Sequence, residues 1–350
     1  MPLHPNRRQF CGALMATPSG WARASVAEPL RVLAWPGYAD PDIVRSFEQR
    51  HQVAVDVTFI DSDLDLWQKL TTGEPAPFDV FAVNTAELQR YIRKGLVAGV
   101  PTAHIPNLAR QQPRFRNLAS IPGLVHDGVA YAIPYTYSEM GLIYDRRQVN
   151  PPPGSLNALW DTRYGGRVIG YNGGTHSFSL AALSLKLPSP FHLSDKDWPR
   201  MVDRLIALRR NVTGFYTRPD ESVALFKQRQ AALMFANFGK QQLQLCTAAG
   251  LDVGYVLPRE GTLAWLDCWA ITHSTRNASL AARWINHMLE PAPSEVLVRR
   301  QGLNNTTSPG PYDTTGSALH WLEPVENEEH RNQLWGRIVS GDRASKVLAS

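Results

Sequence analysis

The chain has 350 residues, of which 43% are hydrophobic and 19% are charged, a balance typical of a globular protein and unlike that of a disordered chain. Its three cysteines are too few for a disulfide scaffold, and no apolar run reaches the roughly 18 residues of a membrane-spanning helix. The formal charge of +5 could suggest a nucleic-acid partner, but the basic residues form no stripe with interleaved aromatic residues. The length is sufficient for two domains.

Residues 1–27 have the layout of an export signal. The paired Arg7-Arg8 precedes a short, mildly apolar run and then small residues, with cleavage expected near Ala24 or Ala27. The adjacent arginines with a phenylalanine two positions on resemble a twin-arginine signal, and an unstructured N-terminus is the alternative. Removal of this segment takes away three arginines and no acidic residue, so the formal charge falls from +5 to +2. We therefore expect a periplasmic protein that is close to neutral.

The first part of the mature chain alternates between strand-like and helical patterns. Its strand-like runs are residues 30–35, 53–59 and 78–83. This β-α-β-α-β order predicts a parallel sheet with crossover helices. Ligands bind at the carboxyl ends of such strands, where Trp35 and Tyr38 follow the first run and Asn84 and Thr85 follow the third. The pattern therefore directs these four residues toward one cleft.

A second α/β series begins near residue 132. Its strand-like runs are 132–135, 141–144, 167–171, 231–235, 253–257 and 265–271. The run at 167–171 leads into a Gly-Gly-Thr-His-Ser turn and a predicted helix near 178–187. Further helices are predicted at 198–210 and 278–290 from their helical spacing of apolar residues.

Five short blocks occur in order along nearly the whole mature chain. They are LAWPGY at 33–38, FDV leading to Asn84-Thr85, AIPY at 132–135, LWD with YGG at 159–166, and GTLAWLD at 261–267. Together these blocks resemble bacterial periplasmic polyamine-binding proteins, the spermidine/putrescine receptors of ABC importers. The resemblance implies an α/β periplasmic-binding-protein fold, with two lobes of mainly parallel sheets that are joined by crossing strands and close over a small ligand.

By that analogy, each lobe takes two separate stretches of the chain. One lobe comprises residues 28–135 and 266–312, and the other comprises 136–265 and 313–350. The resemblance also implies a monomer without a cofactor, which binds a small amine-bearing ligand and delivers it to the membrane permease of an ABC importer.

The resemblance assigns roles in the cleft as well. Trp35, Tyr38 and Trp265 match the aromatic walls of the family, Phe235 stands at a further aromatic position, and Asp267 matches the key carboxylate. A protonated amine needs such aromatic faces and a carboxylate acceptor. Core packing is the alternative for each tryptophan. An aspartate inside an apolar run is costly unless it is paired, so Asp267 needs either a ligand amine or an internal arginine or lysine.

The second half of the cleft departs from the family pattern, because the turn at 172–177 contains no carboxylate. Gly173, Thr175 and His176 offer backbone N–H groups and polar side chains that favour an anion, and Arg218 could add a guanidinium fork. We therefore expect either a polyamine-like ligand or a zwitterion such as an ω-amino acid or aminophosphonate. Plain helix capping is the alternative for this turn.

Other functions and sites have weaker support. A secreted hydrolase could use an Asp267–His176 pair, but no activated nucleophile or paired carboxylates are recognisable, so we expect no enzyme activity. A ligand-binding partner of a membrane sensor stays open. The acidic run 61–65 lacks the glycine and closing glutamate of a calcium loop and predicts a helix cap, and we expect no metal. Cys246 and Cys268 either pair or stay as buried free thiols.

Overall fold

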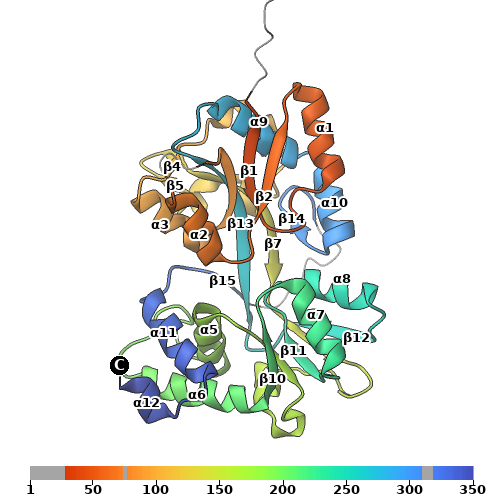
Figure 1. The fold of residues 1–350 in the computed structure, drawn as a ribbon, viewed down its shortest axis with the longest axis vertical. Coiled ribbons are helices and arrows are strands. Elements are labelled where there is room, and N and C mark those ends of the chain that lie inside the picture. The colour runs from red at the N-terminus through yellow and green to blue at the C-terminus, as the bar shows by residue number, and fades with distance from the viewer. Residues whose placement is uncertain (1–27, 74–76, 310–317, 350) are drawn as a thin grey trace, which may run out of the picture.

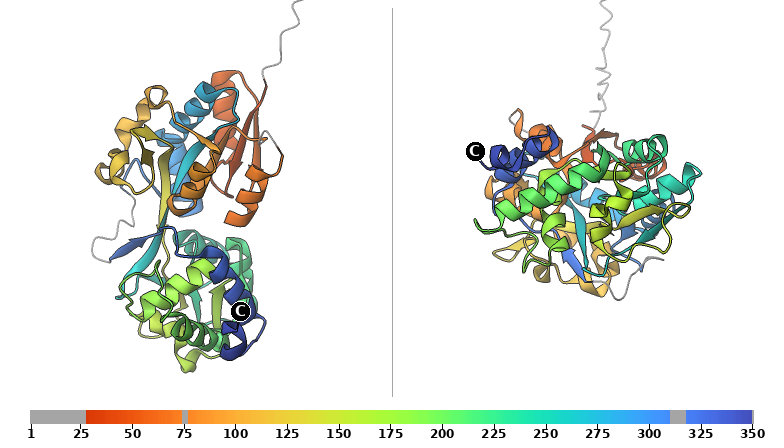
Figure 2. Two further views of the ribbon diagram at one scale, coloured as in Figure 1. Left: turned by 90° about the vertical axis from the view of Figure 1, so that its left-hand side faces the viewer. Right: turned by 90° about the horizontal axis from the view of Figure 1, so that it is seen from below.

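Two sheets of unequal size organise the part of the chain that the computed structural model describes, residues 28–73, 77–309 and 318–349. The larger sheet lies in the upper lobe and the smaller one in the lower lobe, with crossing strands between them (Figures 1 and 2). The export signal predicted for residues 1–27 lies outside the described residues. Within the described ranges, no helix is both long and apolar enough to cross a membrane.

The larger sheet has eight strands, in the order β14-β7-β13-β3-β1-β2 with β15 and β4 also paired to β13. Its strands are β1 (Leu30–Ala34), β2 (Val55–Phe59), β3 (Val80–Asn84), β4 (Val97–Ala98), β7 (Ala132–Glu139), β13 (Thr262–Thr272), β14 (Asn304–Asn305) and β15 (Leu319–Trp321). As predicted, β1 pairs in parallel with both β2 and β3. The sheet is mixed, because β13 runs antiparallel to β3 and β7.

The smaller sheet has five strands, in the order β10-β9-β11-β8-β12. They are β8 (Leu142–Asp145), β9 (Val168–Tyr171), β10 (Val212–Tyr216), β11 (Leu233–Phe235) and β12 (Val253–Val256). Strand β9 pairs in parallel with β10 and β11, whereas β8 is antiparallel to β11 and β12. A separate hairpin joins β5 (Val125–His126) to β6 (Val129–Ala130).

Helices surround both sheets (Figure 1). They are α1 (Pro41–His51), α2 (Asp63–Thr71), α3 (Thr85–Arg93), α4 (Pro113–Arg116), α5 (Gly174–Ser184), α6 (Trp198–Asn211), α7 (Pro219–Gln228), α8 (Lys240–Ala248), α9 (Ala278–Met288), α10 (Pro291–Gln301), α11 (Glu328–Val339) and α12 (Ala344–Leu348). Short 3-10 helices span Thr102–His104, Pro106–Arg110, Leu118–Ser120, Leu156–Trp160 and Thr162–Tyr164. Ser62 caps α2 by accepting from the Asp65 N–H, and Asn84 caps α3 by accepting from the Glu87 N–H.

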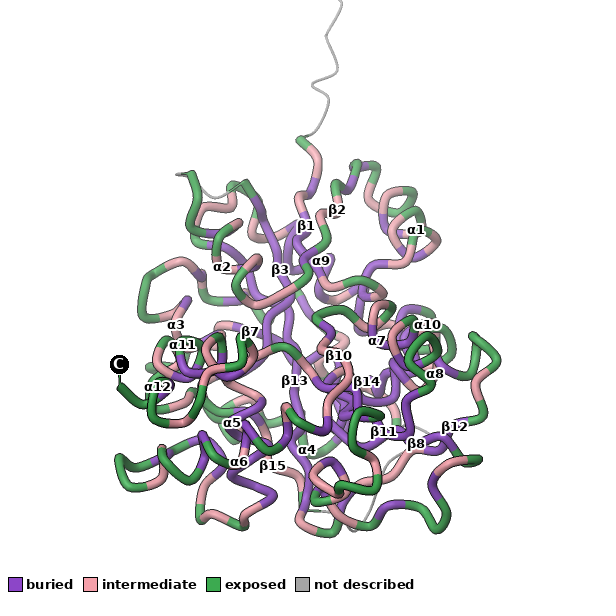
Figure 3. The backbone as a smooth tube through the Cα atoms, turned by 60° about the horizontal axis from the view of Figure 1, so that its bottom comes forward, coloured by how far each residue is buried: buried purple, intermediate pink, exposed green. Residues whose placement is uncertain are grey.

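The core follows the central strands, where the backbone is buried along most of its length (Figure 3). Every residue of β13 is buried. Because side chains alternate along a strand, Trp265, Trp269 and Ile271 join one apolar cluster and Leu266, Cys268 and Ala270 join another. Cys246 lies in a third cluster, and Cys246 and Cys268, the two cysteines among the described residues, are buried free thiols. The lobe boundaries predicted at 135/136 and 265/266 fall within β7 and β13.

A buried arginine anchors the C-terminal helices to the lower lobe. Arg331 on α11 is fully buried and donates from Nε and Nη2 to Glu326, at 2.8 and 2.7 Å. Its guanidinium also donates to Ser179 Oγ at 2.8 Å and to the carbonyls of Thr175 and Phe191, both at 3.1 Å. The guanidinium of Arg331 therefore joins α11 to α5 and to the loop before α6.

We expect Arg331→Met to lower the free energy of unfolding by about 3 kcal/mol, because the Glu326 carboxylate and two carbonyls lose their donor. Urea unfolding followed by tryptophan fluorescence measures the change. The control Gln333→Ala, on the exposed side of the same helix, should change this free energy by less than about 0.5 kcal/mol. Equal stability of Arg331→Met and the unsubstituted protein would contradict the anchoring role.

Candidate functional site

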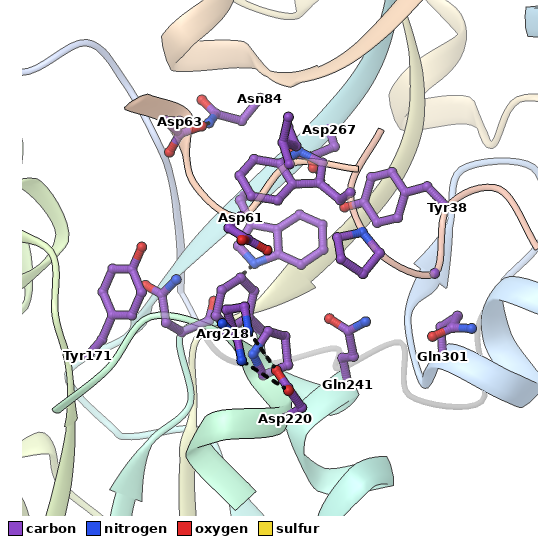
Figure 4. A pocket seen from close by; sticks show the side chains of 18 of the residues that line it. Tyr38, Asp61, Asp63, Asn84, Tyr171, Arg218, Asp220, Gln241, Asp267 and Gln301 are labelled. Carbon is purple, nitrogen blue, oxygen red and sulfur yellow. Dashed lines mark hydrogen bonds and ion pairs between the residues drawn. The ribbon is translucent and has the colours of Figure 1, made fainter. Parts of the chain in front are cut away.

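A cavity of about 380 Å³ lies between the two lobes. Its upper wall comes from the segments at the ends of β1, β2 and β3, and its lower wall from the segments that follow β9, β10 and β11 (Figure 4). The carboxyl ends of strands from both sheets therefore meet here, which is where α/β proteins bind ligands.

The cavity brings together many, but not all, of the ligand residues predicted from the sequence. Those that line it are Trp35, Tyr38, Asn84, His176, Arg218, Trp265 and Asp267. Those outside its lining are Thr85, Gly173, Thr175 and Phe235. Phe235, at the end of β11, packs in the core and is 3% exposed, and the buried Thr85 faces a neighbouring cavity.

The first turn of α5 packs against α11, and Gly173 and Thr175 are not among the residues that line the main cavity. Arg331 donates to the carbonyl of Thr175, and a side chain at Gly174 would collide with the carbonyl of Arg331. Thr175 instead lines a smaller neighbouring cavity of about 250 Å³. Of the predicted turn residues, His176 therefore lines the main cavity and Gly173 and Thr175 do not, and anion binding by this turn stays a prediction.

Asp267 is the buried carboxylate of the cavity. It lies on β13 opposite Asn84 of β3, and its side chain accepts a hydrogen bond of 2.7 Å from the Tyr38 hydroxyl. The Tyr135 hydroxyl in turn donates to the Tyr38 carbonyl and fixes the position of that loop. Burial raises the pKa of Asp267 to about 7, although the hydrogen bond from Tyr38 acts to lower it. Asp267 is thus poised to change its charge near neutral pH.

A second carboxylate, Asp63 in the first turn of α2, lines the same cavity. Asn84 Nδ2 donates to Asp63 Oδ1 at 3.1 Å, so the residue that caps α3 also orients this acid. Burial raises the pKa of Asp63 to about 7, and repulsion from Asp267 and Glu328 adds to the rise. The cavity therefore contains two carboxyl groups, Asp63 and Asp267, whose ionisation is disfavoured by burial.

Aromatic rings supply much of the remaining wall. Trp35 and Trp265 line the cavity, and Trp265 Nε1 donates to the carbonyl of Asn237 at 3.1 Å. Tyr171 stacks on His176 with ring centroids 5.7 Å apart. Burial lowers the pKa of His176 to about 4, so this imidazole is neutral at physiological pH. The tryptophan and tyrosine rings of this wall can accept a cation on their faces.

The outer part of the cavity has charges of both signs (Figure 4). Asp61 comes from the loop before α2, and Arg218 and Asp220 come from the start of α7. Arg218 is paired with Asp220 at 3.3 Å. Among the described lining residues, carboxylates outnumber cationic side chains, so the cavity as a whole favours a positively charged ligand.

The polar contacts do not support the hydrolase alternative. His176 Nδ1 lies 2.8 Å from Asn237 Oδ1, whereas Asp267 accepts from Tyr38, so these two residues do not form an Asp–His pair. Over the described ranges, no three His, Cys, Asp or Glu side chains are grouped so that they could hold a metal ion.

Sequence reasoning missed several residues of the cavity, most importantly the acids Asp61, Asp63 and Asp220. The sequence of the run 61–65 predicts a helix cap, and Asp63 does lie in the first turn of α2. The same run also follows the second parallel strand, at the sheet edge where Trp35 follows the first. The strand-end rule would therefore have identified Asp61 and Asp63 as well.

The raised pKa of Asp267 predicts a defined pH dependence of stability. Because the folded state holds this proton until about pH 7 and the unfolded chain releases it near pH 4, the free energy of unfolding falls as pH rises between these values. Asp267→Asn removes this contribution. We expect the stability of the variant relative to the unsubstituted protein to grow by about 2–4 kcal/mol between pH 4 and pH 8.

Urea unfolding of ligand-free protein at several pH values measures this difference. Tyr38→Phe is the matched variant, because it removes the hydrogen bond that lowers the pKa of Asp267 and should extend the decline above pH 7. A stability difference between Asp267→Asn and the unsubstituted protein that is constant from pH 4 to pH 8 would contradict the burial of an ionisable group here.

Comparisons with known proteins agree on one kind of relative. The model of a family described as bacterial extracellular solute-binding proteins matches residues 42–303. The spermidine/putrescine-binding periplasmic protein of Escherichia coli is 22% identical over 287 residues, which are 82% of this chain and 80% of that protein. A putrescine/cadaverine-binding protein of Pseudomonas aeruginosa is 21% identical over 346 residues, 91% of this chain and 96% of that protein.

Solved structures share the fold. A putative spermidine/putrescine ABC transporter from Listeria monocytogenes superposes with a TM-score of 0.76 at 19% identity, over 90% of this chain and 98% of that one. The PBP MotA from A. tumefaciens B6, in complex with glucopine, superposes with a TM-score of 0.70 at 12% identity, over 89% of this chain and 99% of that one. The two-lobed α/β fold expected from the sequence is confirmed by these likenesses.

Proposed function

The chain belongs to the bacterial extracellular solute-binding protein family. From this membership and from the residues of the cavity, we propose that the protein is the receptor of an ABC importer and captures a small organic amine between its lobes. The membership agrees with the resemblance in its sequence blocks. Relatives named for putrescine, cadaverine, spermidine and agmatine support an amine ligand. A neighbour in complex with glucopine illustrates that the fold accepts other ligands, so the argument for an amine rests on the cavity.

The observation that carries the proposal is the Asp267 carboxylate, buried among Trp35, Tyr38 and Trp265. A buried carboxylate with a single donor lacks a positive partner, and an ammonium group supplies both the charge and the hydrogen bonds. The flanking tryptophans offer faces to the same cation. Asp63, with Asn84 beside it, offers a second carboxylate in the same cavity. A ligand with two ammonium groups satisfies both acids.

These contacts favour a polyamine-like ligand over a zwitterion. The negative end of a zwitterion would need a donor set, and the turn residues Gly173 and Thr175 lie outside the cavity. The remaining candidate, Arg218, is already paired with Asp220. Capture by closure of the two lobes and delivery to a membrane permease are parts of the same proposal.

The test is calorimetric titration of refolded, ligand-free protein with putrescine, a diamine. We expect binding to the unsubstituted protein and a loss of affinity of roughly 10- to 100-fold in Asp267→Asn, because a charge-assisted hydrogen bond is removed. Asp56→Asn, an exposed acid of β2 outside the cavity, is the control and should bind as the unsubstituted protein does. Absence of amine binding by the unsubstituted protein, or unchanged binding by Asp267→Asn, would overturn the proposal.

Ligand binding should also release protons. Because the pKa of Asp267 is near 7 in the free protein, Asp267 is protonated in most molecules at pH 6. The carboxyl group must then lose its proton to bind an ammonium group. Titrations at pH 6 in two buffers of different ionisation enthalpy measure this release, which should decline at pH 8.5 and be smaller in Asp267→Asn. A heat of binding at pH 6 that is the same in both buffers would argue against ionisation on binding.

A further inference from the structure

The outer part of the cavity contains a cation that belongs to the protein. Arg218 lies immediately before Pro219, the first residue of α7, and its Nε and Nη2 donate to the two oxygens of Asp220 at 3.3 and 3.4 Å. Because the imidazole of His176 is neutral, Arg218 is the one cationic side chain among the lining residues that the structure describes. The guanidinium of Arg218 therefore binds the Asp220 carboxylate through two hydrogen bonds.

Acids from both lobes act on this guanidinium. The pKa of Arg218 is raised by its hydrogen bond to Asp220 and by attraction to that acid, with a further contribution from Asp61 in the other lobe. Asp61 and Asp220 line the same cavity as Asp267 and Asp63, and Figure 4 shows Arg218 beside Asp220 in its lower part. Arg218 thus faces two of the four acids, Asp220 and Asp61. Asp63 is attracted by Arg90, whose Nη2 donates to the Asp63 carbonyl at 3.4 Å, and Asp267 accepts only from the neutral Tyr38 hydroxyl among the described contacts.

We propose that Arg218 occupies the place of a ligand ammonium group in the outer part of the cavity and thereby makes the protein select diamines over triamines. The inference rests on the proposed function and names the residue that sets the number of charges on the ligand. Asp267 and Asp63 are left for two ammonium groups, because no cationic side chain among the described lining residues pairs with either carboxylate, and Arg90, outside this lining, donates to the Asp63 carbonyl and not to its carboxylate. A third ammonium would meet a guanidinium in place of a free carboxylate, and like charges repel.

Helix α7 does not depend on the guanidinium for its cap. Glu221 Oε2 accepts from the backbone N–H groups of Thr217 and Arg218, at 2.8 and 3.4 Å, so substitution of the Arg218 side chain leaves these contacts in place. The Arg218 side chain is about half exposed, with a relative exposure of 48%. A variant at this position should therefore fold, and its effect should be confined to the ligand.

The experiment measures the affinities for putrescine and spermidine in the unsubstituted protein, Arg218→Gln and Arg218→Lys. We expect the unsubstituted protein to prefer putrescine, and Arg218→Gln to shift the spermidine-to-putrescine affinity ratio toward spermidine by about fivefold to tenfold. Arg218→Lys keeps the charge and should keep most of the original ratio. The control Arg146→Gln removes a similar exposed pair, with Asp252 at 3.1 Å and outside the cavity, and should leave the ratio unchanged.

The double variant Arg218→Gln/Asp220→Asn identifies the source of the shift. If the freed Asp220 attracts the third ammonium, the added Asp220→Asn change should return the ratio toward its original value. An unchanged ratio in Arg218→Gln, or a shift that persists in full in the double variant, would overturn the inference.

A third probe, 4-aminobutyrate, separates the remaining outcomes. Tight binding of this zwitterion that Arg218→Gln abolishes would mean that the guanidinium holds a ligand carboxylate, which also overturns the inference. Failure of the unsubstituted protein to bind any amine would instead refute the proposed function itself. Putrescine binding with no role for Arg218 would leave the proposed function standing and remove only the selectivity claim.

Discussion

The hydrogen bond from the Tyr38 hydroxyl to the Asp267 carboxylate joins the loop after the first strand to the long strand on which both lobes meet. A carboxylate in that position is withdrawn from water, and one neutral donor offsets only part of the cost. Asp63 adds repulsion from the same cavity. The free protein therefore contains negative charge that a proton or a bound cation must balance, and the surrounding rings keep the local dielectric low enough for this balance to matter.

Strand β13 makes this arrangement possible because it alternates between two apolar clusters along its buried length. Trp265 and Asp267 share one face of the strand, two residues apart, so the aromatic wall and the carboxylate are brought together by local geometry alone. Pairing with β3 then brings Asn84 opposite Asp267, and Asn84 in turn holds Asp63. The acidic centre of the cavity is thus built from strand register and one helix cap.

Part of this centre could be predicted from local sequence patterns, because the β-α-β-α-β order determines which strand ends meet and so indicates Trp35, Tyr38 and Asn84. Trp265 and Asp267 were predicted from the resemblance of their sequence block to periplasmic polyamine-binding proteins. Asp63 was missed because an acid in the first turn of a helix can also face a ligand, and a sequence pattern does not separate the two roles. That Gly173 and Thr175 do not line the cavity could not be predicted, because α5 packs against Arg331, about 155 positions later in the chain. Whether Cys246 and Cys268 form a disulfide could not be predicted, because it depends on the tertiary structure, in which each belongs to a different apolar cluster.

The chain passes between the two lobes more than once. The antiparallel strands β7 and β13 of the larger sheet connect it with the strands of the smaller sheet. After β15, which pairs with β13, the chain returns to the lower lobe, where α11 packs. Each half of the molecule is consequently assembled from separate stretches of sequence. A single crossover between the genes of two relatives cannot exchange one half alone, because the same junction also moves part of the other half. Chimeras of this protein need several junctions, and reporter domains are better inserted at surface loops than fused between halves.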